Sequence, residues 1–273
     1  MARSSSTGKK RIALVVQYLG TDFSGWQWQP NNRTVQAELE SAIRSVTGCS
    51  VRVHGAGRTD AGVHASAQVA HFDVMGPIPP NRWASILNAR LPADICVLVS
   101  SDVKLSWHAQ YSAMYRRYRY TIYTERQPNL FLRALTWHYY QPRLDVFAME
   151  KALRTLLGKN DLSAFRKAGS RRKHSFVEVQ SVSCARQNSL IEIEIQADGF
   201  LYGMVRLLVG SLVQIGIGKQ SVAEFEDMWR SRNRTRVKYS APAKGLCFLR
   251  AGYADIPFAE GIWSQALPSF RVG

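Results

Sequence analysis

The chain has 273 residues, enough for one large or two modest domains with a substantial core. Its formal net charge is +16 at pH 7, from 36 Lys and Arg against 20 Asp and Glu, and this excess indicates a nucleic acid or another polyanion as partner. No apolar run approaches the roughly 20 residues of a membrane span, which excludes a helical membrane protein.

The first half of the chain is predicted to alternate short strands with amphipathic helices. Apolar and β-branched residues favour strands at residues 12–18, 51–55, 67–74 and 95–99. Apolar residues at helical spacing predict a helix from Val35 to a stop at Gly48, and a second one from Trp83 to Leu91 that Pro92 ends.

The second half is predicted to continue in the same way. A strand at 118–122 places tyrosines on one face and arginines on the other. Further strands are expected at 176–185, 190–195 and 246–250, and helices after a cap at Asp145, at 204–215, and from a capping box at Ser221 and Glu224. Because no βαβ rhythm is sustained, these elements indicate an α+β fold with a largely antiparallel sheet.

The expected organisation is two mixed halves with short ends. Residues 1–9 are expected to be a flexible basic tail, 10–105 the N-terminal half, 110–253 the C-terminal half and 254–273 a C-terminal tail. The four cysteines are far apart and form no CxxC pair, which favours reduced thiols over a zinc site or a disulfide framework.

The most informative stretch is Gly55–Ala65, with the sequence GAGRTDAGVHA. Its glycines allow tight turns and the close approach of a large ligand. Arg58, two residues before Asp60, favours the ionised carboxylate that a nucleophile needs. These physical features alone favour a surface turn with an exposed ion pair, because such pairs are common.

The order of the residues in this stretch resembles the active-site motif of the tRNA pseudouridine synthase A (TruA) family. Four further blocks resemble the family in the expected order: residues 23–27 with 34–36, 116–120, 199–201 with 204–206, and 241–246. One departure is Leu19, where the family has an acidic residue after Tyr18, and this places a local contact in doubt.

The resemblance implies a fold, an activity and a partner. The implied fold is the pseudouridine synthase fold, in which two similar halves share a largely antiparallel mixed sheet flanked by helices, with the catalytic cleft between the halves. The implied activity is isomerisation of uridine to pseudouridine at positions 38, 39 and 40 in the anticodon stem-loop of tRNA. It implies a homodimer. Because this isomerisation oxidises nothing and releases nothing, no cofactor is expected, and the sequence around Asp60 offers no ligand cluster for a metal. The separate cysteines favour a cytoplasmic protein.

The resemblance also assigns the candidate active-site residues of this sequence. Asp60 matches the catalytic nucleophile; addition to the sugar, addition to the base and removal of a ribose proton are all open to it. Arg58 would contact phosphate or fill the space left by the flipped base, and Tyr118 would lie against that base. Arg206 would pair with the aspartate, and Leu246 would pack in the pocket. Without the motif, Tyr118 is interpreted as a core residue and Arg58 as a surface arginine.

Two basic clusters are candidates for contact with the RNA backbone, although a run of charges is usually a solvated face. They are Arg166, Lys167, Arg171, Arg172 and Lys173, and Arg230, Arg232, Arg234, Arg236 and Lys238. His64 has no metal-ligand pattern around it and is interpreted as structural. No dinucleotide or P-loop glycine pattern is present.

Two other functions are compatible with parts of this pattern. An RNA N-glycosidase or nuclease would typically use two carboxylates or clustered acidic metal ligands, whereas this motif has one acid. A basic RNA-binding protein or chaperone would explain the charge, but not an aspartate in a surface that must attract phosphate. Isomerisation preserves the mass of the RNA and hydrolysis does not, so mass spectrometry distinguishes the enzymes.

Overall fold

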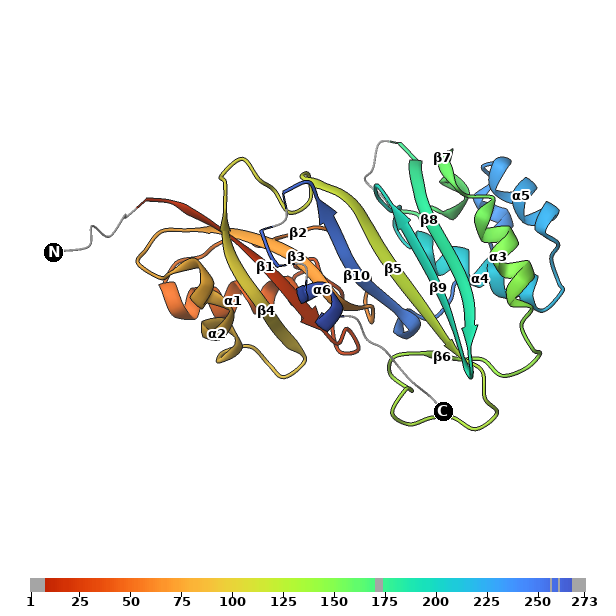
Figure 1. Ribbon diagram of the computed structural model, residues 1–273, viewed down its shortest axis with the longest axis horizontal. Helices are drawn as coiled ribbons and strands as arrows, with labels where there is room; N and C mark the ends of the chain where they lie inside the picture. The colour runs from red at the N-terminus through yellow and green to blue at the C-terminus, as the bar shows by residue number, and fades with distance from the viewer. Residues whose placement is uncertain (1–7, 170–173, 256, 260, 267–273) are drawn as a thin grey trace. The chain divides into compact units, whose positions relative to one another are not determined.

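The computed structural model describes residues 8–169, 174–255, 257–259 and 261–266 (Figure 1). The chain divides into two compact units. The first holds residues up to Met114 together with the segment that starts at Phe248, and the second holds Tyr115–Cys247. Each unit combines antiparallel strands with helices, so the predicted α+β class is confirmed.

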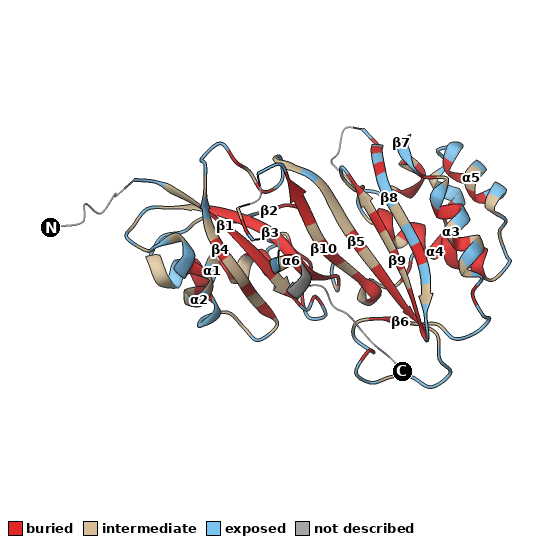
Figure 2. Cartoon of the chain, viewed as in Figure 1, coloured by how far each residue is buried: buried red, intermediate tan, exposed pale blue. Residues whose placement is uncertain are grey.

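The first unit is built on strands in the order β4-β1-β3-β10. Its strands are β1 (Lys10–Tyr18), β2 (His54–Gly55), β3 (His64–Val74), β4 (Ile95–Val103) and β10 (Leu246–Tyr253). The first two residues of β10 belong to the second unit. Strand β1 is antiparallel to β3 on one side and to β4 on the other, and the short β2 pairs with β3. Residues 12–16 of β1 are fully buried and form the centre of this core (Figure 2).

Helices α1 (Val35–Thr47) and α2 (Trp83–Asn88) belong to the same unit, and α2 packs on β4. Helix α1 begins at the Thr34 cap, whose hydroxyl accepts a hydrogen bond from the backbone of Ala37, and it ends at Gly48 in the left-handed conformation. Both ends agree with the prediction. A short helix α6 (Gly261–Ala266) follows near the end of the chain.

The second unit is built on strands in the order β5-β9-β8-β7, with β6 parallel to β5. The strands are β5 (Ala113–Tyr123), β6 (Trp137–His138), β7 (Gly158–Asp161), β8 (Phe176–Gln187) and β9 (Leu190–Ala197). The helices are α3 (Val146–Arg154), α4 (Met204–Gly216) and α5 (Val222–Arg230). Helix α3 packs on β8, α4 and α5, and most residues of α4 are buried (Figure 2).

Several elements differ from the sequence-based expectation. The strand expected at 51–55 is only His54–Gly55, because α1 side chains bind the backbone before it: Glu40 accepts from the Val53 amide, and Gln36 donates to the Val53 carbonyl. Strand β3 begins three residues earlier than expected, since His64 and Ser66 are buried with partners for their side chains. Strands β6 and β7 are too short to have a periodic signal.

Candidate active site

The Asp60 loop, residues 56–63, connects β2 to β3 in the first unit. One side of the loop is held by β3. The amide of Ala56 donates to the carbonyl of Val69 at 2.7 Å. Gly57 is bound twice by the side chain of Gln68, which accepts from its amide at 3.3 Å and donates to its carbonyl at 2.8 Å. This pairing extends the sheet contact of β2 into the loop.

The other side of the loop is held by the segment Gly20–Trp26. The amide of Trp26 donates to the carbonyl of Thr59 at 3.1 Å, and the amide of Gly62 donates to the carbonyl of Phe23 at 3.2 Å. Gly25 has a φ of +95°, and a Cβ there would lie 2.6 Å from the Thr59 carbonyl oxygen. Only glycine allows this approach of the two backbones. This contact explains physically why the first block of the resemblance accompanies the Asp60 motif.

The side chains of the loop alternate between the interior and the surface. Thr59 is buried and shares a hydrogen bond of 2.8 Å with the hydroxyl of Tyr18. Of the residues on either side of it, Arg58 is exposed and Asp60 is half-buried. The amide of Val63 donates to the carbonyl of Asp60 at 3.2 Å and closes the turn. The result is a carboxylate on a fixed backbone beside an accessible guanidinium.

Two residues next to the motif have clear structural positions. His64 is buried, and its Nδ1 accepts the amide of Gly20 at 3.0 Å, which confirms the structural interpretation of this histidine. Leu19, the departure from the family pattern, has 52% of its surface exposed, and its amide donates to the carbonyl of Asp94. Its side chain therefore lies outside the core that supports the loop.

Tyr118 lies in β5 of the second unit, opposite Ile195 of β9. It is 7% exposed, and its ring meets that of Phe200 edge to face, with centroids 4.8 Å apart. Phe200 belongs to another block of the resemblance, residues 199–201. The ring of Tyr118 is thus fixed by a partner that directly precedes α4.

Arg206 lies in the first turns of α4 and is half-buried. Its Nε donates to the carbonyl of Ala241 at 2.8 Å, and its own carbonyl accepts the Ala241 amide at 2.9 Å. The hydroxyl of Tyr120 donates to the carbonyl of Pro242 at 2.8 Å, and burial raises the pKa of this phenol far above its ordinary value. The segment before β10, which ends at the buried Leu246, is therefore anchored at two points.

The structure brings Tyr118, Arg206 and Leu246 into the second unit, whereas Arg58 and Asp60 lie in the first. The predicted pairing of Arg206 with Asp60 stays a prediction.

The arginines on the opposite face of β5 have structural partners that the sequence-based prediction missed. Arg117 pairs with Glu194 at 2.5 Å, and Arg119 reaches Glu192 at 3.2 Å and Glu194 at 2.6 Å. Burial raises the pKa of Glu192. The alternation of glutamates along β9 could have revealed these cross-strand pairs. These ion pairs between β5 and β9 indicate that the arginines of this face stabilise the sheet.

The first basic cluster is described only in part. Lys167 extends over the ring of Tyr202, with its Nζ 5.9 Å from the centroid, and its amide donates to the Tyr202 carbonyl. Arg166 donates to the hydroxyl of Ser175 at 3.3 Å. The other members, Arg171, Arg172 and Lys173, lie outside the described residues.

In the second basic cluster, residues 230–238, most of the cations have partners within the chain. Ion pairs join Arg230 to Glu226 at 2.7 Å, Arg236 to Asp227 at 2.7 Å and Arg232 to Asp161 at 3.4 Å. Arg234 donates to the carbonyl of Val237. Lys238 is exposed. The cluster is thus largely an ion-paired surface from which one lysine extends.

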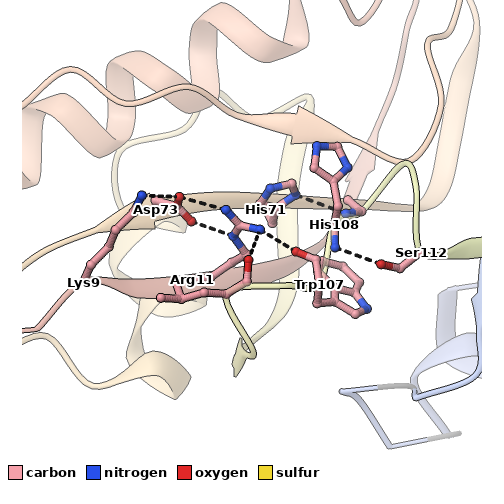
Figure 3. Close-up of polar contacts among 9 residues, drawn as sticks. Lys9, Arg11, His71, Asp73, Trp107, His108 and Ser112 are labelled. Carbon is pink, nitrogen blue, oxygen red and sulfur yellow. Dashed lines mark hydrogen bonds and ion pairs between the residues drawn. The ribbon is translucent and has the colours of Figure 1, made fainter.

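A partly buried polar network joins β1 and β3 to the segment that follows β4 (Figure 3). Arg11 binds both carboxylate oxygens of Asp73, at 2.7 and 2.9 Å, and donates to the carbonyls of Leu105 and Trp107. This arginine lowers the pKa of Asp73 well below its usual range. His71 accepts the amide of Ala109 at 3.2 Å. The network fixes residues 105–109 to β1 and β3.

Within the described ranges, no three or more His, Cys, Asp or Glu side chains are arranged to hold a metal ion. The helices that the structure describes include none long and apolar enough to cross a bilayer.

The chain is similar to known proteins along nearly its whole length. A family model described as tRNA pseudouridine synthase matches residues 14–112 and 152–254. The tRNA pseudouridine synthase A of Rippkaea orientalis is 59% identical over 270 residues, which cover 99% of this chain and 92% of the relative. The enzymes of that name from a Nostoc and a Synechocystis species are 57% and 55% identical, covering 95% and 99% of this chain and 92% and 99% of the relatives.

Among solved structures, a Cbf5-Nop10-Gar1 complex aligns with a TM-score of 0.31 and 10% identity, over 88% of this chain and 59% of that chain. A likeness this weak carries no argument about the present fold or site.

Proposed function

The chain belongs to the tRNA pseudouridine synthase family, an isomerase family acting on uridine in tRNA, and we propose that Asp60 is its catalytic residue. The observation that carries this proposal is the position of the carboxylate. Its backbone is held from two sides, by β3 and by Gly20–Trp26, and its side chain is half-buried, two residues after the exposed Arg58. A reacting group needs this combination of fixed geometry and access.

The reaction sets clear demands on the residues around Asp60. The bond between uracil N1 and ribose C1′ breaks, the base rotates, and a bond forms between C5 and C1′. C5 then loses its proton and N1 gains one, so the composition of the nucleotide is unchanged. Nothing is oxidised and nothing leaves, so the site must retain the free base and take it out of the helical stack. The fixed ring of Tyr118 supplies a stacking face, and Leu246 an apolar wall.

The two arginines have different tasks in this proposal. Arg58 is exposed, so its guanidinium is available to a phosphate or to the space left by the flipped base. Arg206 is half-buried and bound to Ala241 through Nε, and its guanidinium is the cation that the proposal assigns to the carboxylate of Asp60 as a positioning partner. The proposal requires the second unit's residues to act on the same uridine as Asp60.

We extend the proposal to the substrate and the assembly. The uridines are those at positions 38, 39 and 40 of the anticodon stem-loop, and the enzyme is a cytoplasmic homodimer. The supports are the similarity to curated tRNA pseudouridine synthases A over nearly all of both chains and the net charge of +16. Sequencing of pseudouridine in tRNA after incubation tests the positions, and sedimentation of the full chain tests the dimer.

The test of the catalytic assignment is Asp60→Asn, which keeps the size of the side chain and removes its charge. We expect single-turnover isomerisation at saturating protein to fall by about a thousandfold or more. Affinity for tRNA should stay within about threefold, because the lost charge is one that repels phosphate. The matched control is Asp102→Asn, an exposed aspartate of β4 in the same unit with the same change in net charge.

Folding is checked in parallel by thermal unfolding, because Arg206 would lose an ionic partner. A folded Asp60→Asn variant that binds tRNA and still forms pseudouridine would overturn the assignment. Mass spectrometry of the product separates the rival functions. A loss of uracil mass would indicate a glycosidase, and unmodified tRNA with wild-type protein would indicate a binding protein.

A further inference from the structure

A pocket of about 440 Å³ lies in the second unit, and none of the residues assigned to the active site is among those that line it. It is lined by α4, by the connection from α4 to α5, by α5 and by the segment 236–239. Pockets that bind small ligands or single groups of larger ones typically measure about 300–1,000 Å³. The polar side chains used below are Gln214, Lys219, Gln220, Arg236, Lys238 and Tyr239.

One wall of the pocket is the segment 237–241, which lies closely along α4. A Cβ at Gly210 would be 2.5 Å from the carbonyl oxygen of Tyr239, so glycine is needed for this approach. The segment is fixed again by the two hydrogen bonds between Arg206 and Ala241, and Val237 is buried. Lys238 and Tyr239 therefore project from a backbone that is anchored on both sides.

The opposite wall is the connection between α4 and α5. The amide of Lys219 donates to the carbonyl of Gln214 at 2.9 Å, which closes the end of α4. Helix α5 then begins with a capping box, in which the Glu224 carboxylate accepts from the amide of Ser221 at 2.7 Å and from its hydroxyl at 2.8 Å. These bonds lower the pKa of Glu224. The single carboxylate among the lining residues is thus occupied by the helix cap.

The cations of the pocket are not all occupied in this way. Arg236 is paired with Asp227 at 2.7 Å. Lys219 and Lys238 are exposed, and neither has an ion pair with another residue that the structure describes. Tyr239 lines the same pocket and keeps 52% of its surface exposed. An exposed aromatic ring beside unpaired lysines is the combination that binds single-stranded nucleic acid.

We propose that this pocket binds one nucleotide unit of the substrate RNA, with the ammonium groups of Lys219 and Lys238 on the phosphodiester and the ring of Tyr239 against the adjoining base. The inference rests on the proposed function, since it names a second contact with the same RNA. Gln214 and Gln220 are placed to bind ribose or phosphate oxygens that the lysines leave open. The pocket would hold the RNA and take no part in bond breaking.

The charge contribution is tested with Lys219→Ala/Lys238→Ala. We expect the tRNA dissociation constant to rise on the order of tenfold, and the slope of log K against log salt to flatten by about 0.7 to 1, the value for one phosphate contact. The control is Lys151→Ala/Lys159→Ala, which removes two exposed lysines of the same unit that do not line the pocket. Its affinity should change by less than about threefold with an unchanged slope.

The stacking contribution is tested with Tyr239→Ala against Tyr239→Phe. The alanine variant should weaken tRNA binding by roughly five- to a hundredfold, since it removes the ring, and the phenylalanine variant should bind as the wild type does. Neither change should alter the salt slope, because neither removes a charge. A phenylalanine variant that binds as weakly as alanine would contradict stacking, since it would assign the effect to the hydroxyl.

The outcomes separate this inference from the proposed function. If the wild type forms pseudouridine and the Lys219/Lys238 variant binds like the Lys151/Lys159 variant, the pocket is not an RNA contact and the proposed function is unaffected. If the wild type binds tRNA without forming pseudouridine, the proposed function fails, and the binding data alone support or overturn the pocket. Isomerisation by saturated complexes of the pocket variants should match the wild type within about threefold.

Discussion

The Asp60 loop and the basic segment 230–239 are both polar connections, yet the chain holds them in opposite ways. In the loop, the backbone is bound from both sides, by Gln68 and Val69 on β3 and by Phe23 and Trp26, while the side chain of Arg58 is exposed and that of Asp60 half-buried. In the basic segment, the charged side chains themselves are bound, in ion pairs with acids of the same unit.

The difference follows from the two tasks. Bond breaking depends on the position of the reacting atom, and a displacement of about 1 Å can cost a hundredfold in rate. Attraction to phosphate falls slowly with distance and is limited by counterions, so it tolerates mobile side chains but not cations that are already neutralised. We therefore expect changes in the loop to reduce the rate with little effect on binding, and changes at the pocket lysines to do the reverse.

Among the variants that separate the effects on rate from those on tRNA binding, the largest effect is expected for Gly25→Ala. The new Cβ would lie 2.6 Å from the Thr59 carbonyl oxygen at a φ of +95°, so the two segments must separate. We expect the free energy of unfolding to fall by about 2–4 kcal/mol and isomerisation to fall at least about tenfold. The slope of tRNA affinity against salt should stay unchanged. Urea unfolding and single-turnover assays measure these effects.

Gly48→Ala is the matched control, since Gly48 also has a positive φ, of +72°, but open space around its Cβ position. It should lose about 1 kcal/mol from backbone strain alone and keep full activity. Equal losses in the two variants would show that the close approach to Thr59 has no role in the site.

The sequence predicted the Asp60 loop well, because its glycines, its arginine and its aspartate are contiguous. Helix ends were also predictable from local signals, such as the cap at Thr34 and the capping box at Ser221 and Glu224. The shortened β2 was not, because the competing bonds come from Gln36 and Glu40, more than ten residues away. Tertiary contacts of this kind leave no local pattern.

The basic clusters show a second limit of the sequence. In the sequence, Arg232 and Lys238 both appear as one positive charge of the same cluster. In the structure, Arg232 pairs with Asp161, seventy-one positions earlier, whereas Lys238 lies at a pocket wall. The pair of Arg230 with Glu226 has helical spacing and was readable in principle. Lys219 stands apart from both clusters in the sequence, and the fold alone places it with Lys238.

An intermediate effect is expected from acid, which acts on the strands at the base of the loop. His54 of β2 lies opposite His71 of β3, with ring centroids 5.0 Å apart, and the ring of His108 is 4.5 Å from that of His71. Burial, assisted by His108 and Arg11, lowers the pKa of His71 from 6.5 to about 3. The pKa values of His54 and His108 are lowered as well, chiefly by burial.

The sign of the effect follows from proton binding. Between pH 6.5 and about 3 the unfolded chain binds a proton at His71 that the folded chain does not, so stability is full above pH 6.5 and is lost as the pH falls. From pH 7 to pH 5 we expect a loss of about 1–2 kcal/mol in the free energy of unfolding. The loss should be smaller in His71→Gln. Binding of tRNA should not weaken over this range, because protonation adds positive charge. A stability that stays constant from pH 7 to 5 would contradict the neutral state assigned to these histidines.

The smallest effect is expected where the loop rests on the core. Tyr18→Phe removes the hydroxyl that shares a 2.8 Å hydrogen bond with Thr59, and leaves the Thr59 hydroxyl buried without this partner. We expect a loss of about 1 kcal/mol in stability and a few-fold loss in isomerisation, with unchanged tRNA binding. Tyr239→Phe, which removes an exposed hydroxyl, should leave stability and isomerisation unchanged.

The double variant Tyr18→Phe/Thr59→Val removes both polar partners and should recover most of the stability, since neither group is then left unsatisfied. If its rate recovers too, packing alone positions the loop; if its rate stays low, the hydrogen bond itself fixes the backbone next to Asp60.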